Sequence, residues 1–270
     1  MALEMSDSQD PLAADPTDPA AGLLTFLDRV ERLPDVVARR HRSYERLAAR
    51  AGGAIADIGC GAGTAVRELA PHVAPGGSAV GVDVNEALIK TAAARAARAG
   101  VDVAFHVASA QALPFPPASL DGYRAERLYQ HLTEPVKALA EARRVLVPGG
   151  RIVLVDQDWD AVLLDSEDKA TTRAILRAFS DGIANSAVGR QYHRLLLDAG
   201  FSDVRVEADV HTSTSFDEYG YLPGLAAPVA EAFGVVGSAA AEKWLADQRD
   251  RGQRGRYFMA MTHFMVSARR

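Results

Sequence analysis

Short apolar runs alternate with amphipathic segments between residues 54 and 156, and this alternation constrains the fold more than any other feature. The strand-type runs are AIADIG, SAVGVDV, VDVAFHVAS, LDGYRAERL and RIVLVD. The helix-type segments between them are TAVRELAPHV, NEALIKTAAARAARAG and TEPVKALAEARRVLVPGG. Such an order predicts an α/β fold, with a doubly wound, mostly parallel sheet covered by helices on both faces. Its ligand is expected beyond the carboxyl ends of the strands.

The segments outside this alternation predict a tail, an N-terminal helical region and a cap. Residues 1–22 carry five acids and no base, which predicts a disordered tail and does not fit a secretory signal. Residues 23–50 predict one or two helices, broken near Pro34. Near the C-terminus, DVRVEADVHT and RYFMAMTHFMVSAR predict an antiparallel pair of strands at the sheet edge. Residues 216–250 between them predict a helical cap, so we expect a single domain over residues 23–270.

The net charge and the cysteine content limit which binding partners and which cell compartment the chain can have. The net charge of -5 argues against a general nucleic-acid binder. Five arginines in residues 37–53 favour a solvated helix face over an RNA-binding patch. No apolar run approaches the ~20 residues of a membrane helix, and Cys60 is the only cysteine, which fits a reducing compartment. We therefore expect a cytoplasmic protein with a small-molecule partner, no nucleic acid and no membrane.

The stretch IADIGCGAG at residues 55–63 predicts a nucleotide site of a particular kind. Glycines stand at 59 and 61, but Thr64 takes the place of the third glycine of the dinucleotide pattern G-x-G-x-x-G. Asp57 at the strand end would repel a pyrophosphate and attract a cation. S-adenosylmethionine carries an ammonium and a sulfonium group and no phosphate, so we predict that Asp57, Gly59 and Gly61 hold its methionine part.

Two later strand ends complete the predicted cofactor site. Asp83 ends VGVDV, where an acid accepts hydrogen bonds from ribose hydroxyls, in NAD folds as well. In VASAQALPF, Ser109 is expected to face the adenine amino group, with Ala110 and Leu113 packed on the ring. The other residues expected around the cofactor are Cys60, Val84 and Arg124.

Four motifs in order resemble those of class I S-adenosylmethionine-dependent methyltransferases, in the branch of the ubiquinone/menaquinone C-methyltransferases. They are IADIGCGAG, VGVDVNEALIKTA, ASAQALPFPPASLDGY and EARRVLVPGGRIVLVD. The resemblance covers roughly residues 50–160. It implies a Rossmann-like seven-stranded sheet with an antiparallel last strand, and S-adenosylmethionine as cofactor. Ser109 departs from the family, where aspartate is common.

Three residues after the fourth strand are candidates for catalysis. His131 is the best candidate base, because imidazole titrates near neutral pH. Tyr129 is expected to orient the acceptor, and Glu126 to face the crevice. Each also has a structural interpretation: His131 and Tyr129 as packing residues, and Glu126 as an exposed partner of Arg127. Alignment alone can supply roughly 7–11 kcal/mol of a methyl transfer.

The segment DQDWDAVLL and the N-terminal helices supply the expected substrate contacts. Asp156, Asp158 and Asp160 alternate around Trp159. This pattern fits a metal site, a pocket for a basic or hydroxylated substrate, or a solvated loop with Trp159 packed under the cap. We expect no metal, and assign Asp158, Trp159 and Tyr44 to the substrate.

The function expected from these features is methyl transfer to O, N or C of a small molecule, such as a natural-product intermediate enclosed by the cap. Two alternatives remain open at this point. One is a protein that binds S-adenosylmethionine and catalyses a non-methylating cyclisation or rearrangement. The other is an NAD-dependent oxidoreductase. The oligomeric state is also open, with a homodimer among the options.

Overall fold

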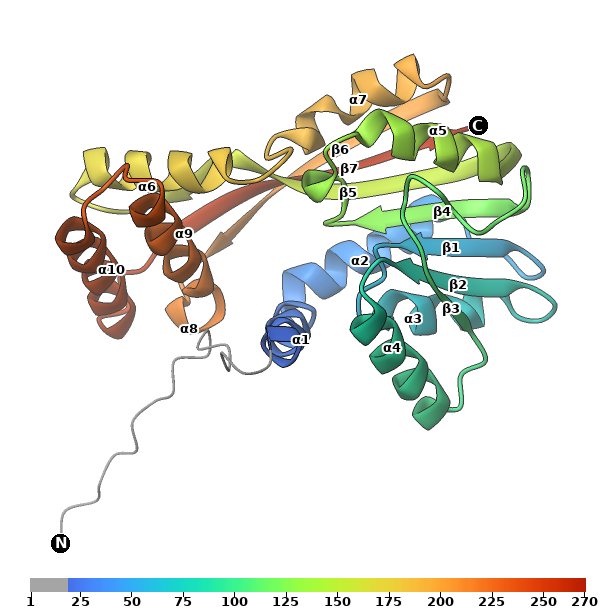
Figure 1. The fold of residues 1–270 in the computed structure, drawn as a ribbon, viewed down its shortest axis with the longest axis horizontal. Coiled ribbons are helices and arrows are strands. Elements are labelled where there is room, and N and C mark those ends of the chain that lie inside the picture. The colour runs from blue at the N-terminus through green and yellow to red at the C-terminus, as the bar shows by residue number, and fades with distance from the viewer. Residues whose placement is uncertain (1–18) are drawn as a thin grey trace, which may run out of the picture.

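A computed structural model describes residues 19–270 as a seven-stranded sheet flanked by helices, with a second group of helices at one end (Figure 1). Most of the predicted tail, residues 1–18, lies outside the described residues. Residues 19–22 belong to the first helix, so the predicted boundary at residue 22 was wrong by four residues. No helix of residues 19–270 has both the length and the apolar character needed to cross a membrane.

The sheet has the strand order β3-β2-β1-β4-β5-β7-β6. Strands β1 to β4 pair in parallel with each other and with β5, whereas β7 runs antiparallel to both of its neighbours, β5 and β6. The predicted fold, a mostly parallel sheet with an antiparallel last strand, is confirmed. The strands are β1 (Ala54–Ile58), β2 (Ser78–Asp83), β3 (Ala104–Val107), β4 (Leu120–Glu126), β5 (Leu146–Leu164), β6 (Ser202–Ser213) and β7 (Met259–Arg269).

Helices cover both faces of the sheet because its central strands are apolar on both sides. In β5, Ile152 and Leu154 pack toward α5 and α7, whereas Val153 and Val155 pack toward α2, α3 and α4. This alternation explains why RIVLVD has no polar face. The helices of these two layers are α2 (Pro34–Leu47), α3 (Thr64–Val73), α4 (Glu86–Ala99), α5 (Pro135–Val145) and α7 (Val188–Asp198), with the 3-10 turn η1 (Tyr129–His131) before α5.

The helical cap consists of α6, α8, α9 and α10. The first helix, α1, lies between this cap and α4 (Figure 1). The cap has its own core, in which Ile175 of α6 packs against Ala227 of α9 and Trp244 of α10. The indole Nε1 of Trp244 donates to Thr172 Oγ1 at 2.8 Å. The sequence predicted the helices between the last two strands but not that α6 joins them. The bounds are α1 (Pro19–Val30), α6 (Lys169–Asp181), α8 (Phe216–Tyr219), α9 (Tyr221–Ala232) and α10 (Ser238–Gln253).

Two strands, β5 and β7, run from the sheet into the cap (Figure 1). The segment DQDWDAVLL belongs to β5, which ends only at Leu164. The interpretation of this segment as a loop was therefore wrong. The pairing of β5 with β7 is irregular between Asp158 and Leu163, where the register shifts.

Local capping fixes where the helix after β2 begins and ends. Asn85 Oδ1 accepts hydrogen bonds from the amides of Ala87 and Leu88 at 3.0 and 3.1 Å, and so caps α4. Gly100 ends the helix with a φ of 66°. Because Asn85 caps α4, Asp83 lies directly before the N-terminus of this helix. This is the carboxyl end of the parallel strands, where the cofactor is expected.

Candidate active site

The glycine-rich turn after β1 is held against β2 by its own backbone. The amides of Gly59 and Cys60 both donate to Val82 O, at 2.7 and 3.0 Å. Gly61 has a φ of 52°, and a Cβ built there would meet nothing nearer than 3.8 Å. Backbone conformation and not packing therefore favours glycine at 61, because a Cβ there would make only an ordinary van der Waals contact with Leu27.

Asp83 is positioned by two backbone amides. Its Oδ2 accepts from Gly61 N and its Oδ1 from Asn85 N, each at 2.9 Å. A carboxylate has about four lone-pair sites, so each oxygen can still accept another hydrogen bond. The residues present therefore fit a ribose with two hydroxyl donors, and the ribose contact of Asp83 stays a prediction.

Asp57 does not present a free carboxylate to a ligand. Its Oδ1 binds Arg124 NH1 at 2.7 Å, and Arg124 also binds Glu126. Both members of the Asp57–Arg124 pair are almost fully buried, at 4% and 2% exposure. Asp57, Arg124 and Glu126 thus form a buried triplet with a net charge of about -1, and the negative charge predicted for Asp57 belongs to this triplet as a whole. Arg124, which was predicted to contact the cofactor, is instead paired with these two acids.

Tyr44 supports this triplet from α2. Its ring lies 5.4 Å from the Arg124 guanidinium, and its hydroxyl donates to Glu68 at 2.9 Å. Ser43, the preceding residue, accepts from Arg124 Nε at 2.7 Å. The predicted substrate contact by Tyr44 is therefore replaced by a positioning role, because its buried ring and hydroxyl are already engaged.

The pKa shifts favour the charged forms of Arg124 and Glu126, whereas burial raises the pKa of Asp57 in spite of its pairing with Arg124. Burial alone would lower the pKa of Arg124, but Asp57 and Glu126 outweigh it and raise that pKa. Burial would likewise raise the pKa of Glu126, but Arg124 and Arg127 outweigh it and lower that pKa. Glu126 is thus a weak base with its carboxylate committed to Arg124, which argues against the catalytic role predicted for it.

Tyr129, the second catalytic candidate, is a core residue. Its side chain is fully buried, and its hydroxyl lies 3.0 Å from the hydroxyl of Tyr123. The ring meets Tyr192 edge to face, with 5.8 Å between centroids. A hydroxyl enclosed in this way cannot touch an acceptor molecule, so the prediction for Tyr129 was wrong.

His131 is exposed at the end of η1 and belongs to a short hydrogen-bonded chain. Trp159 Nε1 donates to Gln130 Oε1 at 2.7 Å, which turns the Gln130 amide nitrogen toward His131 Nε2 at 3.0 Å. The imidazole therefore accepts at Nε2 and carries its proton on Nδ1. Partial burial and Arg127 both lower the pKa of His131 below 6.5, so the ring is neutral at physiological pH.

The three acids of DQDWD do not converge on one metal site. Asp156 points toward α7 and accepts from the Tyr192 hydroxyl. Asp158, assigned to the substrate from the sequence, instead forms a two-pronged ion pair with Arg190 of α7. Trp159 packs edge to face on Phe179 at 5.1 Å. Its ring therefore lies in the apolar cluster under the cap, one of the alternatives that the sequence left open.

Four further residues were assigned to the cofactor. Ser109 Oγ accepts from Gln111 N at 3.1 Å, which leaves its hydroxyl proton for a ligand. Val84 is 69% exposed beside Asp83 and offers apolar surface there. Ala110 instead packs into the core of the sheet. Cys60 is buried beside the turn, and burial raises its thiol pKa, so it is not a nucleophile.

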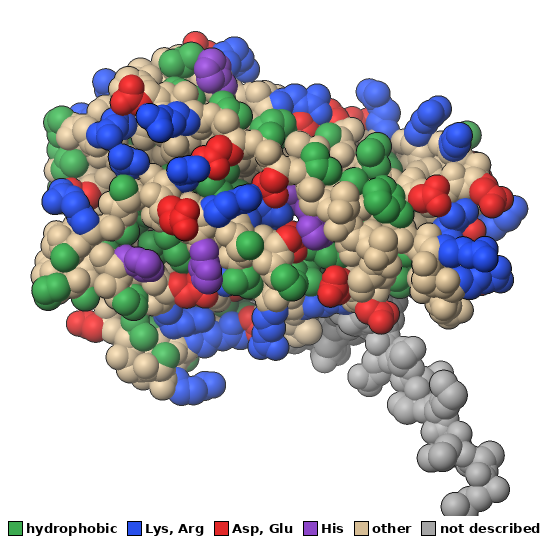
Figure 2. All heavy atoms as spheres, turned by 180° about the vertical axis from the view of Figure 1, so that it is seen from behind, with side chains coloured by type: hydrophobic (Ala, Val, Ile, Leu, Met, Phe, Trp, Pro, Cys, Tyr) green, Lys and Arg blue, Asp and Glu red, His purple; other side chains and the backbone are tan. Residues whose placement is uncertain are grey.

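The arginines of α2 and of the turn that follows it are neutralised, which argues against an RNA-binding patch. Each of the five is paired with an acid, and the pairs are Arg39–Asp35, Arg40–Glu68, Arg42–Asp209, Arg46–Glu207 and Arg50–Asp121. Figure 2 likewise shows basic and acidic side chains interspersed over one face of the molecule. The basic run is a set of ion pairs between α2, the sheet and α3.

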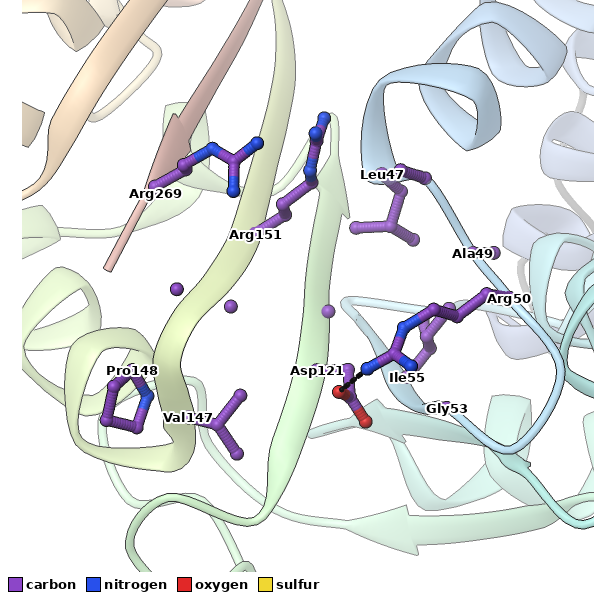
Figure 3. A pocket seen from close by; sticks show the side chains of 14 residues that line it. Leu47, Ala49, Arg50, Gly53, Ile55, Asp121, Val147, Pro148, Arg151 and Arg269 are labelled. Atoms are coloured by element: carbon purple, nitrogen blue, oxygen red, sulfur yellow. Dashed lines mark hydrogen bonds and ion pairs between the residues drawn. The ribbon is translucent and has the colours of Figure 1, made fainter.

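A cavity of about 350 Å³ lies at the opposite end of the strands, where β1, β4 and β5 begin (Figure 3). Arg50 and Asp121 form an ion pair of 3.0 Å across it, and Arg151 and Arg269 line the other side. Ligands of such sheets bind at the carboxyl ends of the strands. The glycine turn and Asp83 are at that other end, so this cavity is not the cofactor site.

The strand order with one antiparallel strand, the glycine turn and the anchored acid after β2 define a nucleoside-binding α/β fold of the class I methyltransferase type. Residues 55–150 match the protein family described as "Methyltransferase domain". The chain belongs to the class I S-adenosylmethionine-dependent methyltransferases, as the motifs indicated.

Three relatives are similar to the chain in sequence, and one solved structure is similar to it in fold. An uncharacterized 37.1 kDa protein of transposon TN4556 from Streptomyces fradiae is 33% identical over 91% of the chain and 70% of its own length. The ubiquinone/menaquinone biosynthesis C-methyltransferase UbiE of Marinomonas sp. is 30% identical, over 57% and 62%. The 27-O-demethylrifamycin SV methyltransferase of Amycolatopsis mediterranei is 38% identical, over 40% and 39%. The crystal structure of YcgJ from Bacillus subtilis has a TM-score of 0.62 at 18% identity, over 87% and 98%. The two relatives named as methyltransferases therefore match the chain over less than two thirds of their length.

Proposed function

We propose that this methyltransferase transfers a methyl group to an oxygen, nitrogen or carbon atom of a small natural-product intermediate, mainly by proximity and orientation. The observation that carries the proposal is the anchored carboxylate of Asp83, whose Oδ2 accepts a hydrogen bond from the amide of Gly61 in the glycine turn, on a sheet that continues into a helical cap. The similarity to a methyltransferase that acts on a demethylrifamycin supports a natural product as acceptor.

The protein residues would hold the reactants and keep water away. S-adenosylmethionine, when bound, supplies a methyl group activated by a sulfonium. Asp83 would hold the ribose, and the glycine turn the methionine part. The buried triplet of Asp57, Arg124 and Glu126 keeps the end of β1 rigid and slightly negative, which suits a cation. Alignment of this kind can supply roughly 7–11 kcal/mol.

Replacement of Asp83 tests the cofactor site. Asp83→Ala removes two acceptors for ribose hydroxyls, and hydrogen bonds to a charged group contribute about 1.5–3 kcal/mol each. We expect the affinity for S-adenosylhomocysteine to fall by about 100-fold or more in calorimetry, with an unchanged circular dichroism spectrum. Glu86→Ala, which removes a nearby exposed acid paired with Lys90, should change affinity by less than about twofold. If Asp83→Ala and the wild type bind S-adenosylhomocysteine with equal affinity, Asp83 does not contact the cofactor.

The reaction itself is tested with methyl-labelled cofactor. The full chain is incubated with S-adenosylmethionine and a cell extract, and products are read by mass spectrometry. We expect a small molecule that gains the labelled methyl group, with an equal amount of S-adenosylhomocysteine. Turnover of an acceptor without release of S-adenosylhomocysteine would instead support the non-methylating cyclisation or rearrangement.

His131 remains our proposed base for acceptors that must lose a proton. An acceptor hydroxyl would replace the Gln130 amide at Nε2, the nitrogen that carries the lone pair. His131→Ala should lower turnover of the identified acceptor by about 100-fold, and leave S-adenosylhomocysteine affinity unchanged. Wild-type turnover should be flat above pH 6.5 and fall only below it, because the pKa of His131 lies below this value.

The matched control is His193→Ala, which removes an exposed histidine from α7. It should behave like the wild type in both measurements. If His131→Ala weakens cofactor binding as much as turnover, His131 is a structural residue and the base must be sought elsewhere.

A further inference from the structure

Four buried polar atoms without hydrogen-bond partners gather past the end of β4. They are Arg39 Nε, Gln157 Oε1, His211 Nε2 and His263 Nδ1. We call these four residues the Gln157 patch. Arg39, Gln157 and His263 are each less than 9% exposed. An unpaired buried polar group destabilises the folded state, so four of them in one place indicate that a polar partner fills the patch.

The strand register places the patch on one face of the sheet. Gln157 of β5 lies opposite His263 of β7, which lies opposite Asp209 of β6. His211 is two residues beyond Asp209 and therefore faces the same side. Arg39 reaches this face from α2, with its Nε 3.8 Å from Asp209 Oδ2.

The patch lies next to the expected position of the reaction. Gln157 is two residues beyond Val155, which pairs with Glu126, the last residue of β4. Val155 and Cys60 of the glycine turn belong to the same core cluster. On its other side the patch meets the cap, because the His211 ring stacks at 4.6 Å on Tyr219 of α8. A small molecule bound here would lie between the cofactor turn and the cap.

The charges in the patch are balanced, so it does not favour an anion. Asp35 binds Arg39 NH2 at 2.9 Å and lies 3.5 Å from His211 Nδ1. Asp209 provides a second carboxylate near Arg39. Burial lowers the pKa of both His211 and His263, which keeps both rings neutral. Asp35 and Asp209 face the guanidinium groups of Arg39 and Arg42, so no positive charge is left over to attract a phosphate or a carboxylate.

The free atoms define the hydrogen bonds that a ligand must make. Because Nδ1 of His211 faces the Asp35 carboxylate, it carries the proton, and Nε2 is an acceptor. Gln157 Oε1 is a second acceptor, and Arg39 Nε is a donor. The ligand must therefore offer hydroxyl hydrogens to two acceptors and an oxygen to one donor. The neighbouring side chains Val36, Met261 and Tyr219 are apolar or aromatic, which suits a hydrocarbon remainder.

We propose that the Gln157 patch binds the acceptor molecule of this methyltransferase, and that this acceptor is a neutral compound with two adjacent hydroxyl groups on an apolar skeleton. The proposal rests on the proposed function, since it assigns the substrate class of the same site. It differs from the sequence-based expectation, which placed the substrate on Asp158, Trp159 and Tyr44.

The test compares two probes that differ by one hydroxyl. The full chain, saturated with S-adenosylhomocysteine, is titrated with tert-butylcatechol and with tert-butylphenol in a calorimeter. We expect the catechol to bind at least about tenfold more tightly, because a site with buried acceptors rejects a ligand that leaves one unpaired. Gln157→Leu should abolish this preference and raise Tm, because it removes an unpaired buried oxygen.

A matched control separates the patch from any other buried glutamine. Gln248 of α10 is fully buried with an unpartnered Oε1, but lies in the cap beside Asp165. Gln248→Leu should keep the preference for the catechol. Equal binding of both probes by the wild type, or the same loss of preference in both variants, would overturn the proposal and leave the patch to water. Failure to bind S-adenosylhomocysteine would instead contradict the proposed function.

Discussion

Replacing Arg124 by methionine is expected to lower the free energy of unfolding by about 3–5 kcal/mol, the usual cost of removing one partner from a buried ion pair. Methionine fills a similar volume but leaves Asp57 and Glu126 side by side without a counter-charge. Both carboxylates are almost fully screened from water, at 5% and 8% side-chain exposure. Urea titration of the full chain measures the effect.

A second variant keeps this prediction testable if Arg124→Met fails to fold. The triple variant Asp57→Asn, Arg124→Met, Glu126→Gln removes all three charges and should regain most of the lost stability. Arg194→Met, which breaks an exposed pair with Asp198, should change stability by less than about 0.5 kcal/mol. A triple variant no more stable than Arg124→Met would show that charge balance is not what this cluster contributes.

Asp156→Asn is expected to stabilise the protein at neutral pH and not at acidic pH. Burial is the main cause that raises the pKa of Asp156 from 3.8 to about 7, although the Tyr192 hydroxyl opposes it. The folded chain then keeps the proton between about pH 4 and pH 7 while the unfolded chain loses it. The stability that this group contributes is present below pH 4 and is lost as the pH rises to 7.

The variant isolates this effect because asparagine does not titrate. The stability of Asp156→Asn minus that of the wild type should grow between pH 4 and pH 7 by roughly 4 kcal/mol, at 1.36 kcal/mol per pKa unit. Asp198→Asn, which removes an exposed carboxylate on the surface of α7, should change the stability by less than about 0.5 kcal/mol. A difference for Asp156→Asn that is constant over this range would show that Asp156 is ionised throughout.

The sheet and the cofactor loop could be predicted because their signals are local in the sequence. The glycine turn needs Gly61 for its φ, and Asp83 binds an amide only two residues away at Asn85. Both features follow from a few consecutive residues. The family motifs added the strand count and the antiparallel last strand, which composition and periodicity alone do not specify.

The misplaced residues depend on partners that are distant in the sequence. Arg124 neutralises Asp57 from 67 residues away, and Tyr192 meets Asp156 from 36 residues away. Acidic residues in an extended segment resemble a loop until their partners on α7 are known. The Gln157 patch was missed for the same reason: α2 and three different strands contribute to it, and no short motif connects them.

The measurement that tests this account most directly is calorimetry of the purified full chain with S-adenosylmethionine and, separately, with NADH. Asp83 and the glycine turn are expected to bind S-adenosylmethionine at one site per chain, and NADH should give no binding heat. Tight binding of NADH with no response to S-adenosylmethionine would contradict the assignment of the site.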